Sequence, residues 1–296
     1  MKQGKGVLLV IAGAALWGFM GVFVRTLTAF GFNSLQVAAI RITVAALIFL
    51  GIVLCRDTSL LKIRLRDIGW FLCTGLISVL LMTLTYATAI EHLSMSTAAI
   101  LLYVAPILVM VISVLFLKES LTWQKLVSLP VAFGGCVLVT GWDGANSLFG
   151  IVMALCSAVA YASYTVFGSV LLKRYHPLTV TTYSFLIASV GILSVCDLSG
   201  LVSCCVRQTS GIEVAAWMVG CGLETAVLPF LLYTLGLRFV GAGKAAVLSY
   251  VEPMVATLSG LVLFGEPLTL SLVCGILLII GAVVLLNSNE LFGKSS

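Results

Sequence analysis

Long apolar runs follow one another along almost the whole chain. Each is close to the roughly 20 residues that a helix needs to cross the hydrocarbon core of a bilayer. Charges, glycines and prolines separate them into ten expected spans: 6–27, 34–55, 68–90, 94–117, 121–139, 148–172, 177–196, 212–237, 242–264 and 268–286. The pattern predicts an all-α polytopic membrane protein with ten transmembrane helices.

Composition supports this interpretation. Of 296 residues, 61% are hydrophobic and only 9% charged, whereas soluble domains carry about 25% charged residues. The apolar run at 6–24 is too long for a cleaved signal peptide, so we interpret it as a retained first helix. We expect a multi-pass protein integral to the cell (plasma or inner) membrane, with the lipid bilayer as its surroundings and no separate soluble domain.

Basic residues predict the orientation. With the N-terminus in the cytoplasm, all but three of the 16 lysines and arginines fall in cytoplasmic segments. Arg25 and Arg207 lie on the opposite side, and Arg41 lies within the second helix. The positive-inside rule therefore predicts cytoplasmic N- and C-termini. The net charge of +5 is spread along the chain, so we expect no nucleic-acid partner.

The chain repeats itself. The stretch Ala98–Pro106 recurs as Ala245–Pro253, and the same offset relates Tyr86 to Tyr233 and Glu119 to Glu266. The sequence predicts two five-helix repeats, 1–140 and 148–288, within one membrane domain. Because five is odd, the second repeat must insert upside down relative to the first. Inverted repeats are typical of secondary transporters; the alternative is a duplication that serves structural economy alone.

Several motifs of the chain resemble those of a known family. Phe116–Thr122 and its counterpart Phe264–Thr269, together with Ala14–Gly18 and Arg41, are similar to the signature positions of the EamA-like ten-helix exporters of the drug/metabolite transporter superfamily. The resemblance covers essentially the whole chain. It implies a central cavity lined by the first, third, fourth, sixth, eighth and ninth helices. It leaves the substrate open, since members export amino acids, other metabolites and cationic compounds.

Three ionisable residues are expected inside the membrane, where charge is costly and usually functional. Glu224 lies near the middle of the eighth helix and is the favoured carrier of protons or partner of a substrate amine. Glu252 lies in the ninth helix before Pro253, either lining the cavity or satisfying local groups. Arg41 either has a structural role or binds a substrate carboxylate.

Aromatic residues fall within the helices instead of at the interfaces, where tryptophan and tyrosine usually concentrate. Mid-helix placement favours a wet, aromatic-lined cavity suited to flat or cationic substrates, although ordinary packing is the alternative for each one. The candidates are Trp17, Tyr86, Tyr103, Tyr161, Tyr164, Tyr233 and Tyr250.

Small residues and prolines are expected to shape the helix contacts. Gly134 and Gly135 of the fifth helix, with Gly275 and Gly281 of the tenth, favour close packing between these two helices. Three prolines within apolar runs are expected to kink their helices: Pro106, Pro229 and Pro253.

Other classes of function find little support. No H-E-x-x-H motif, no G-x-S-x-G motif with a partner histidine and no phosphate-binding loop occurs, so we expect no enzymatic activity and no cofactor. The nine cysteines have no metal-site spacing, so we expect no metal. The sequence predicts an alternating-access exporter of small molecules such as amino acids, with protons as a further ligand. The alternatives are a transporter of organic cations, a channel or a scaffold, in each case a monomer or weak homodimer.

Overall fold

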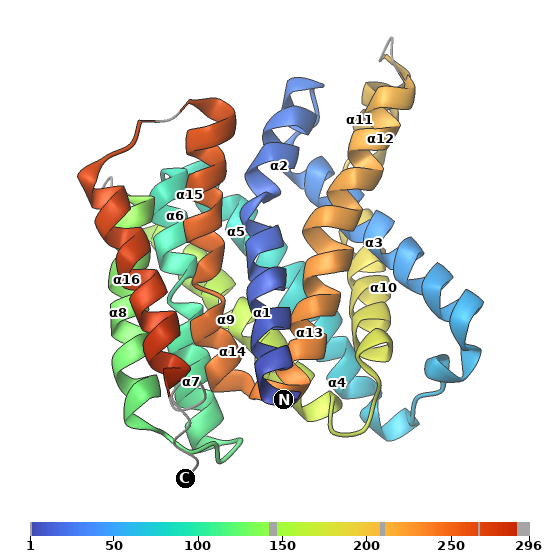
Figure 1. Cartoon of the computed structure of the whole chain (residues 1–296). Coiled ribbons are helices and arrows are strands. Elements are labelled where there is room, and N and C mark those ends of the chain that lie inside the picture. Colours follow the sequence, from blue (N-terminus) through green and yellow to red (C-terminus); the bar gives the residue numbers. More distant parts are fainter. Residues whose placement is uncertain (1, 142–146, 208–210, 266, 289–296) are drawn as a thin grey trace.

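The computed structural model describes residues 2–141, 147–207, 211–265 and 267–288. Within these ranges every regular element is a helix, and the longer helices run side by side as an elongated bundle (Figure 1). The all-α fold predicted from the sequence is confirmed. The repeat position Glu266 lies outside the described residues.

Five segments form the first half. They are α1 (Lys2–Gly18) with α2 (Met20–Ala29); α3 (Ser34–Arg56); α4 (Ile68–Leu72), η3 (Cys73–Leu81) and α5 (Met82–His92); α6 (Met95–Leu102) with α7 (Ala105–Leu115); and α8 (Trp123–Thr140). The connection after α3 contains two short 3₁₀ turns, η1 (Thr58–Leu61) and η2 (Leu65–Asp67).

The second half has the same order. Its segments are α9 (Leu148–Leu171); α10 (Pro177–Val195); α12 (Gly211–Gly222), η4 (Leu223–Val227) and α13 (Leu228–Val240); α14 (Ala242–Leu248) with α15 (Val251–Phe264); and α16 (Leu270–Leu286). One helix, α11 (Leu198–Val206), occupies the connection between the seventh and eighth expected spans, where the sequence pattern predicts no helix. Asp197 begins it by accepting a hydrogen bond from the Gly200 amide.

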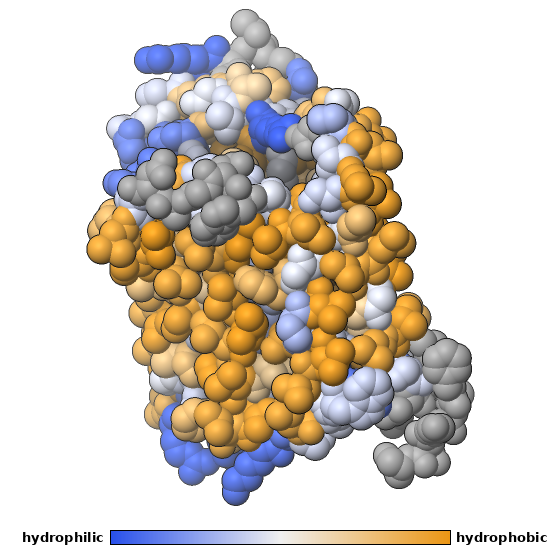
Figure 2. All heavy atoms as spheres, turned by 90° about the vertical axis from the view of Figure 1, so that its left-hand side faces the viewer, coloured by the Kyte–Doolittle hydropathy of each residue, from blue (hydrophilic) through white to orange (hydrophobic). Residues whose placement is uncertain are grey.

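The surface is that of a membrane protein. In the described part of the chain, nine helical segments are long and apolar enough to span a bilayer, and the shorter apolar helix α16 corresponds to the expected tenth. Figure 2 shows a broad hydrophobic belt across the face on the left of Figure 1, with hydrophilic atoms gathered at both ends. α1 begins and α16 ends at the same end of the bundle (Figure 1); that this end is cytoplasmic stays a prediction.

Contacts between the halves follow the sequence repeat. Gly75 of η3 lies so close to α10 that a Cβ would come within 2.6 Å of Ile187, and a Cβ on Gly222 of α12 would overlap Val44 of α3 in the same way. Gly222 is the repeat equivalent of Gly75, and Ile187 is the equivalent of Val44. Each half therefore packs the same small residue against the same helix of the other half, as small residues allow in membranes.

The fifth and tenth spans also pack through glycine. A Cβ on Gly135 of α8 would lie 2.8 Å from the Gly275 carbonyl of α16, and a Cβ on Gly275 would lie 2.7 Å from the Gly135 carbonyl. Gly134 and Gly281 instead meet nothing within 4 Å among the described residues. The close packing predicted between these helices is present, but only one glycine of each helix creates it.

Polar contacts join the two halves at the end where α1 begins. The Glu119 carboxylate accepts hydrogen bonds from the amides of Ala242 (2.7 Å) and Gly243 (3.2 Å) at the start of α14. Free amides at a helix start favour such an anion. Buried Asp67 accepts from the Arg174 guanidinium at 2.9 Å and the Tyr175 hydroxyl at 2.8 Å. Both contacts hold the halves together at this end.

Candidate functional site

Two broken helices cross at the centre of the candidate site. The span formed by α6 and α7 is interrupted at Tyr103–Val104, and the span formed by α14 and α15 at Ser249–Tyr250. Each break lies just before a proline that was expected to kink its helix, Pro106 or Pro253, because proline has no amide to donate to the preceding turn. The Tyr250 hydroxyl donates to the Tyr103 carbonyl at 2.8 Å, so one break satisfies a backbone group of the other.

A third break, between α1 and α2, lies against the second of these. At this break, a Cβ on Gly18 would be 2.9 Å from the Glu252 carbonyl and 2.7 Å from the Val255 side chain. Glycine is therefore required for this approach of the α1 backbone to α15. The third break brings Trp17, the residue before Gly18, to the same region.

Glu252 lies in the first turn of α15 and is half-buried. Its carboxylate accepts a hydrogen bond of 3.3 Å from the Tyr103 hydroxyl. Tyr86 and Tyr161 lie within electrostatic range of the same carboxylate. An acid in the first turn of a helix is favoured by the helix dipole, which gives Glu252 a structural stabilisation in addition to its position among three tyrosines.

Arg41 of α3 is the basic member of the site. It is half-buried and within electrostatic range of Glu252, although the two side chains, both in the described part of the chain, form no direct ion pair. Its guanidinium donates to the sulfur of Met20, at the start of α2, at 3.3 Å. We call the following residues the Glu252 cluster: Glu252, Arg41, Tyr103, Tyr86, Tyr161 and Trp17.

Trp17 closes one side of the cluster. Its ring centroid lies 6.3 Å from that of Tyr161 in an edge-to-face arrangement, 5.0 Å from Phe230 and 5.3 Å from Tyr233. These are favourable distances for aromatic pairs. Trp17 is buried, so in this conformation its ring packs against neighbouring side chains and little of its surface is accessible to a ligand.

The remaining predicted tyrosines join helices to one another. The Tyr164 hydroxyl pairs with Thr234 at 3.0 Å, and the Tyr233 hydroxyl pairs with Thr165 at 2.9 Å, in both cases between α9 and α13. All four residues are buried. Tyr161 and Tyr164 lie three residues apart in α9, and their partners differ: Tyr161 lies near Ser249, whereas Tyr164 packs against Phe230.

The structure does not bring Glu224 into the Glu252 cluster. Glu224 lies in η4, a π-helical turn between α12 and α13, and is half-buried. Among the described residues its carboxylate has no hydrogen-bond or ion-pair partner, while neighbouring Thr225 donates to the Cys221 carbonyl at 2.6 Å. Such π-helical turns often occur at functional sites, and the equivalent position of the first half, η3, also contains one.

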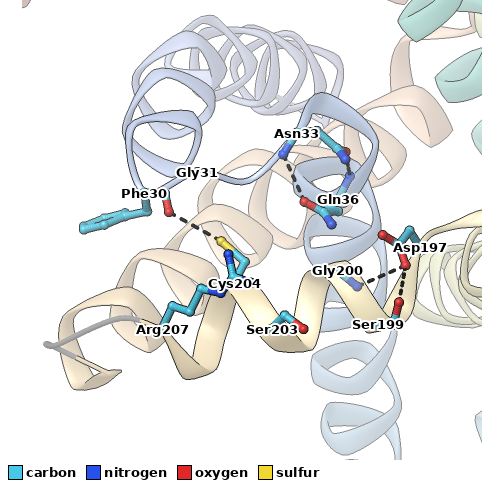
Figure 3. A pocket seen from close by; sticks show the side chains of 10 residues that line it. All are labelled: Phe30, Gly31, Asn33, Gln36, Asp197, Ser199, Gly200, Ser203, Cys204 and Arg207. Atoms are coloured by element: carbon cyan, nitrogen blue, oxygen red, sulfur yellow. Dashed lines mark hydrogen bonds between the residues drawn. The ribbon is translucent and has the colours of Figure 1, made fainter.

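A cavity of about 530 Å³ opens at the other end of the bundle, between the α2–α3 connection and α11 (Figure 3). Its lining includes Gln36, Asp197, Cys204 and Arg207. The Asp197 carboxylate accepts from the Gly200 amide (3.0 Å) and the Ser199 hydroxyl (2.7 Å), and these bonds hold the pKa of Asp197 below its ordinary value. This cavity carries opposite charges but shares no lining residue with the Glu252 cluster.

Sequence reasoning missed several contributors. Met20 and Phe230 look like ordinary apolar residues in the sequence, and only the fold reveals that they contact Arg41 and Trp17. Ser249 could have been noticed, since it is a polar residue directly before Tyr250 in a repeated motif. The Asp67–Arg174 ion pair joins two connections far apart in the sequence, and nothing in the spacing indicates it.

Fold and site together define a polytopic membrane protein whose two halves enclose a small set of charged and aromatic groups. The model of the EamA-like transporter family matches residues 4–141 and 148–288. The chain belongs to this family.

The relatives are transporters of similar length. An uncharacterized transporter of Archaeoglobus fulgidus is 29% identical over 96% of each chain. A protein of Streptantibioticus cattleyicolor named "Probable terminal-alkyne amino-acid exporter" is 25% identical, over 98% of this chain and 96% of its own. A solved crystal structure superposes with a TM-score of 0.78 over 99% of this chain and 100% of its own. At 18% identity it shows the fold alone.

Proposed function

We propose that this protein is a secondary-active exporter of small amphipathic metabolites, with amino acids as the leading class, working by alternating access. The observation that carries the proposal is the position of Glu252. Its carboxylate lies among three tyrosines where broken helices of the two halves cross. The name of the Streptantibioticus relative supports the amino-acid class for this chain.

Broken helices suit a substrate site because they leave polar backbone groups free within the membrane, where such groups are otherwise satisfied inside a helix. The contacts of Glu119 and of Asp67 tie the halves together at the end where α1 begins. Release of these contacts would let the halves rock about the crossing and expose the site to that end. This supports alternating access over a continuous channel.

We assign the coupling proton to Glu252. The sequence favours Glu224, but the geometry favours Glu252. Its carboxylate accepts a hydrogen bond from the Tyr103 hydroxyl and lies within electrostatic range of Arg41. A carboxylate that binds either a proton or a substrate amine couples proton transport to substrate transport, and no other titratable residue is needed. Glu224 remains the second candidate for this role.

A second candidate substrate is an organic cation. The observation in its favour is the combination of an acid with several aromatic rings, which attracts positive ligands. A non-transporting scaffold is less well supported, since ionisable groups within the membrane are rarely kept without a function.

Counterflow in proteoliposomes tests the proposal. Purified protein is reconstituted with a labelled panel of amino acids and organic cations, with and without a pH gradient. We expect exchange of amino acids by the wild type and loss of exchange in Glu252→Gln. The matched control is Glu213→Gln, which changes an exposed acid at the start of α12 and should leave exchange unchanged. Exchange of cations alone would reject the amino-acid class, and no exchange at all would reject the carrier.

A further inference from the structure

Arg41 and Glu252 are opposite charges in the membrane that interact without pairing. They lie within electrostatic range of each other. Both belong to the described residues, yet no nitrogen of Arg41 lies within the 4.0 Å ion-pair distance of a Glu252 oxygen. Opposite charges in a medium of low dielectric attract strongly, so an open pair needs an explanation.

Each member has a weak partner and spare bonding capacity. Arg41 carries five N–H donors, and its hydrogen-bond acceptor in the described part of the chain is the Met20 thioether, a weak acceptor. Glu252 accepts a long bond of 3.3 Å from Tyr103, which leaves most of its acceptor sites free. Among the described residues neither charge has a strong partner, although charges inside a membrane are normally paired.

The break between α1 and α2 lies beside both residues. On one side, Gly18 is in close contact with the Glu252 main chain. Two residues later, Met20 contacts the guanidinium of Arg41. The Glu252 main chain and the Arg41 guanidinium therefore both contact one short stretch of chain, Gly18–Met20, and we expect a change in this break to alter the positions of the two residues.

We propose that Arg41 and Glu252 bind the two ends of a zwitterion, Arg41 taking the α-carboxylate and Glu252 the α-ammonium group of a free amino acid. This rests on the proposed function and names the chemistry that its site selects. The planar guanidinium matches a carboxylate in two parallel hydrogen bonds. A bound zwitterion satisfies both protein charges at once, whereas an amine alone leaves Arg41 unpaired and a carboxylic acid alone leaves Glu252 unpaired.

The test compares each amino acid with analogues that lack one charge. Proteoliposomes are assayed for counterflow of leucine and phenylalanine, of their decarboxylated amines (3-methylbutylamine and 2-phenylethylamine), and of their deaminated acids (4-methylpentanoate and 3-phenylpropanoate). We expect the wild type to prefer the amino acids over both kinds of analogue by at least about tenfold, since an unpaired polar group in a site rejects the incomplete ligand strongly.

Charge-neutralising variants should shift this preference in opposite directions. Arg41→Gln should lose exchange of amino acids and favour the amines, while Glu252→Gln should favour the deaminated acids. Arg41→Lys keeps the charge and should retain part of the amino-acid preference. The control is Arg56→Gln, at the exposed end of the same helix. The ratio of amino acid to amine is the readout, because a merely structural role lowers all rates together and leaves the ratio unchanged.

The outcomes separate the two proposals. Exchange of amino acids and amines at equal rates by the wild type would overturn the zwitterion site and leave the exporter intact. Equal loss of every compound in Arg41→Gln and Arg41→Lys would also overturn it. Exchange of none of the six compounds by the wild type would reject the amino-acid exporter together with this site.

Discussion

The break between α6 and α7 and the break between α14 and α15 are equivalent positions of the two halves, and they share nearly everything. Each break includes the tyrosine of a Tyr-Val pair, Tyr103 or Tyr250, and in each half a proline lies three residues after that tyrosine. The spans that begin afterwards are capped alike: Thr122 accepts from the Lys125 amide, and Thr269 accepts from the Leu272 amide. The scaffold of the two halves is therefore the same.

The chemistry of the two breaks differs. Where the second half has Glu252, the first has buried Ala105, and where η4 has Glu224, η3 has Ile77. Arg41 is matched in α10 by Ser184. The break between α1 and α2 also has no counterpart, since α9 is continuous. The comparison teaches that the repeat supplies the common scaffold, while the proposed binding groups lie at positions where the two halves differ.

The largest expected effect separates the two acids of the second half. Glu252→Gln should lower amino-acid counterflow by about 100-fold or more, in the range of losing a hydrogen bond to a charged group, about 3 kcal/mol. Glu224→Gln should lower it by less than about threefold, because Glu224 has no described partner. Initial rates at equal protein content give both values. A Glu224→Gln variant that loses all dependence on a pH gradient while retaining exchange would return the coupling role to Glu224.

The next effect tests the shared scaffold. Gly75→Ala and Gly222→Ala should each destabilise the protein by about 1–3 kcal/mol, because the added methyl overlaps Ile187 or Val44. Similar losses in thermal unfolding in detergent are expected for the two. Gly134→Ala and Gly281→Ala are the controls, because the added methyl group meets no described atom within 4 Å. A large difference between Gly75→Ala and Gly222→Ala would mean that the two contacts are not equivalent.

A smaller effect distinguishes the two tyrosines of the crossing. Tyr103→Phe removes the hydroxyl that bonds Glu252 and should change the apparent substrate affinity about fivefold, the equivalent of one hydrogen bond of about 1 kcal/mol. Tyr250→Phe removes a bond to a backbone carbonyl and should instead lower stability by about 1 kcal/mol. Concentration dependence of counterflow and thermal unfolding measure the two quantities. The same response from both variants would contradict this division of roles.

The smallest effect concerns a strained position. Lys118 has a φ of 56° where its repeat equivalent, Gly265, has 66°. A residue with a Cβ pays about 1 kcal/mol in this left-handed region. Lys118→Gly should therefore raise stability by about 0.5–1 kcal/mol, with Lys118→Ala as the control that gains nothing. A lower unfolding temperature for Lys118→Gly would show that the lysine side chain itself contributes at this position.

The helices could be predicted more closely than their interruptions. The spans expected at 34–55 and 148–172 agree with α3 and α9 to within one residue at each end, because charges and turn residues bound them. α11 was missed, since Leu198–Val206 is too short and mixed to stand out. Prolines indicated the breaks at Tyr103 and Tyr250, but the break at Phe19 has no proline and depends on contact with α15.

The candidate site could be predicted only as a set of residue types. Tyrosines and acids within apolar runs were visible, yet three of the tyrosines turned out to join helices through Thr165, Thr234 and the Tyr103 carbonyl. A helix that is apolar on all sides gives no periodic signal of which face points inward. For that reason the sequence could not decide between Glu224 and Glu252.

The sequence by itself determined that this protein spans the membrane many times and that its halves repeat. Both follow from local requirements: lipid demands long apolar helices that satisfy their own backbone, and duplication leaves matching residues in register. Only the tertiary structure decided which acid lies within electrostatic range of Arg41. The rotation of each helix, and the place where its backbone breaks, are set by close contacts between the halves, such as Gly18 on Glu252, and no single segment contains that information.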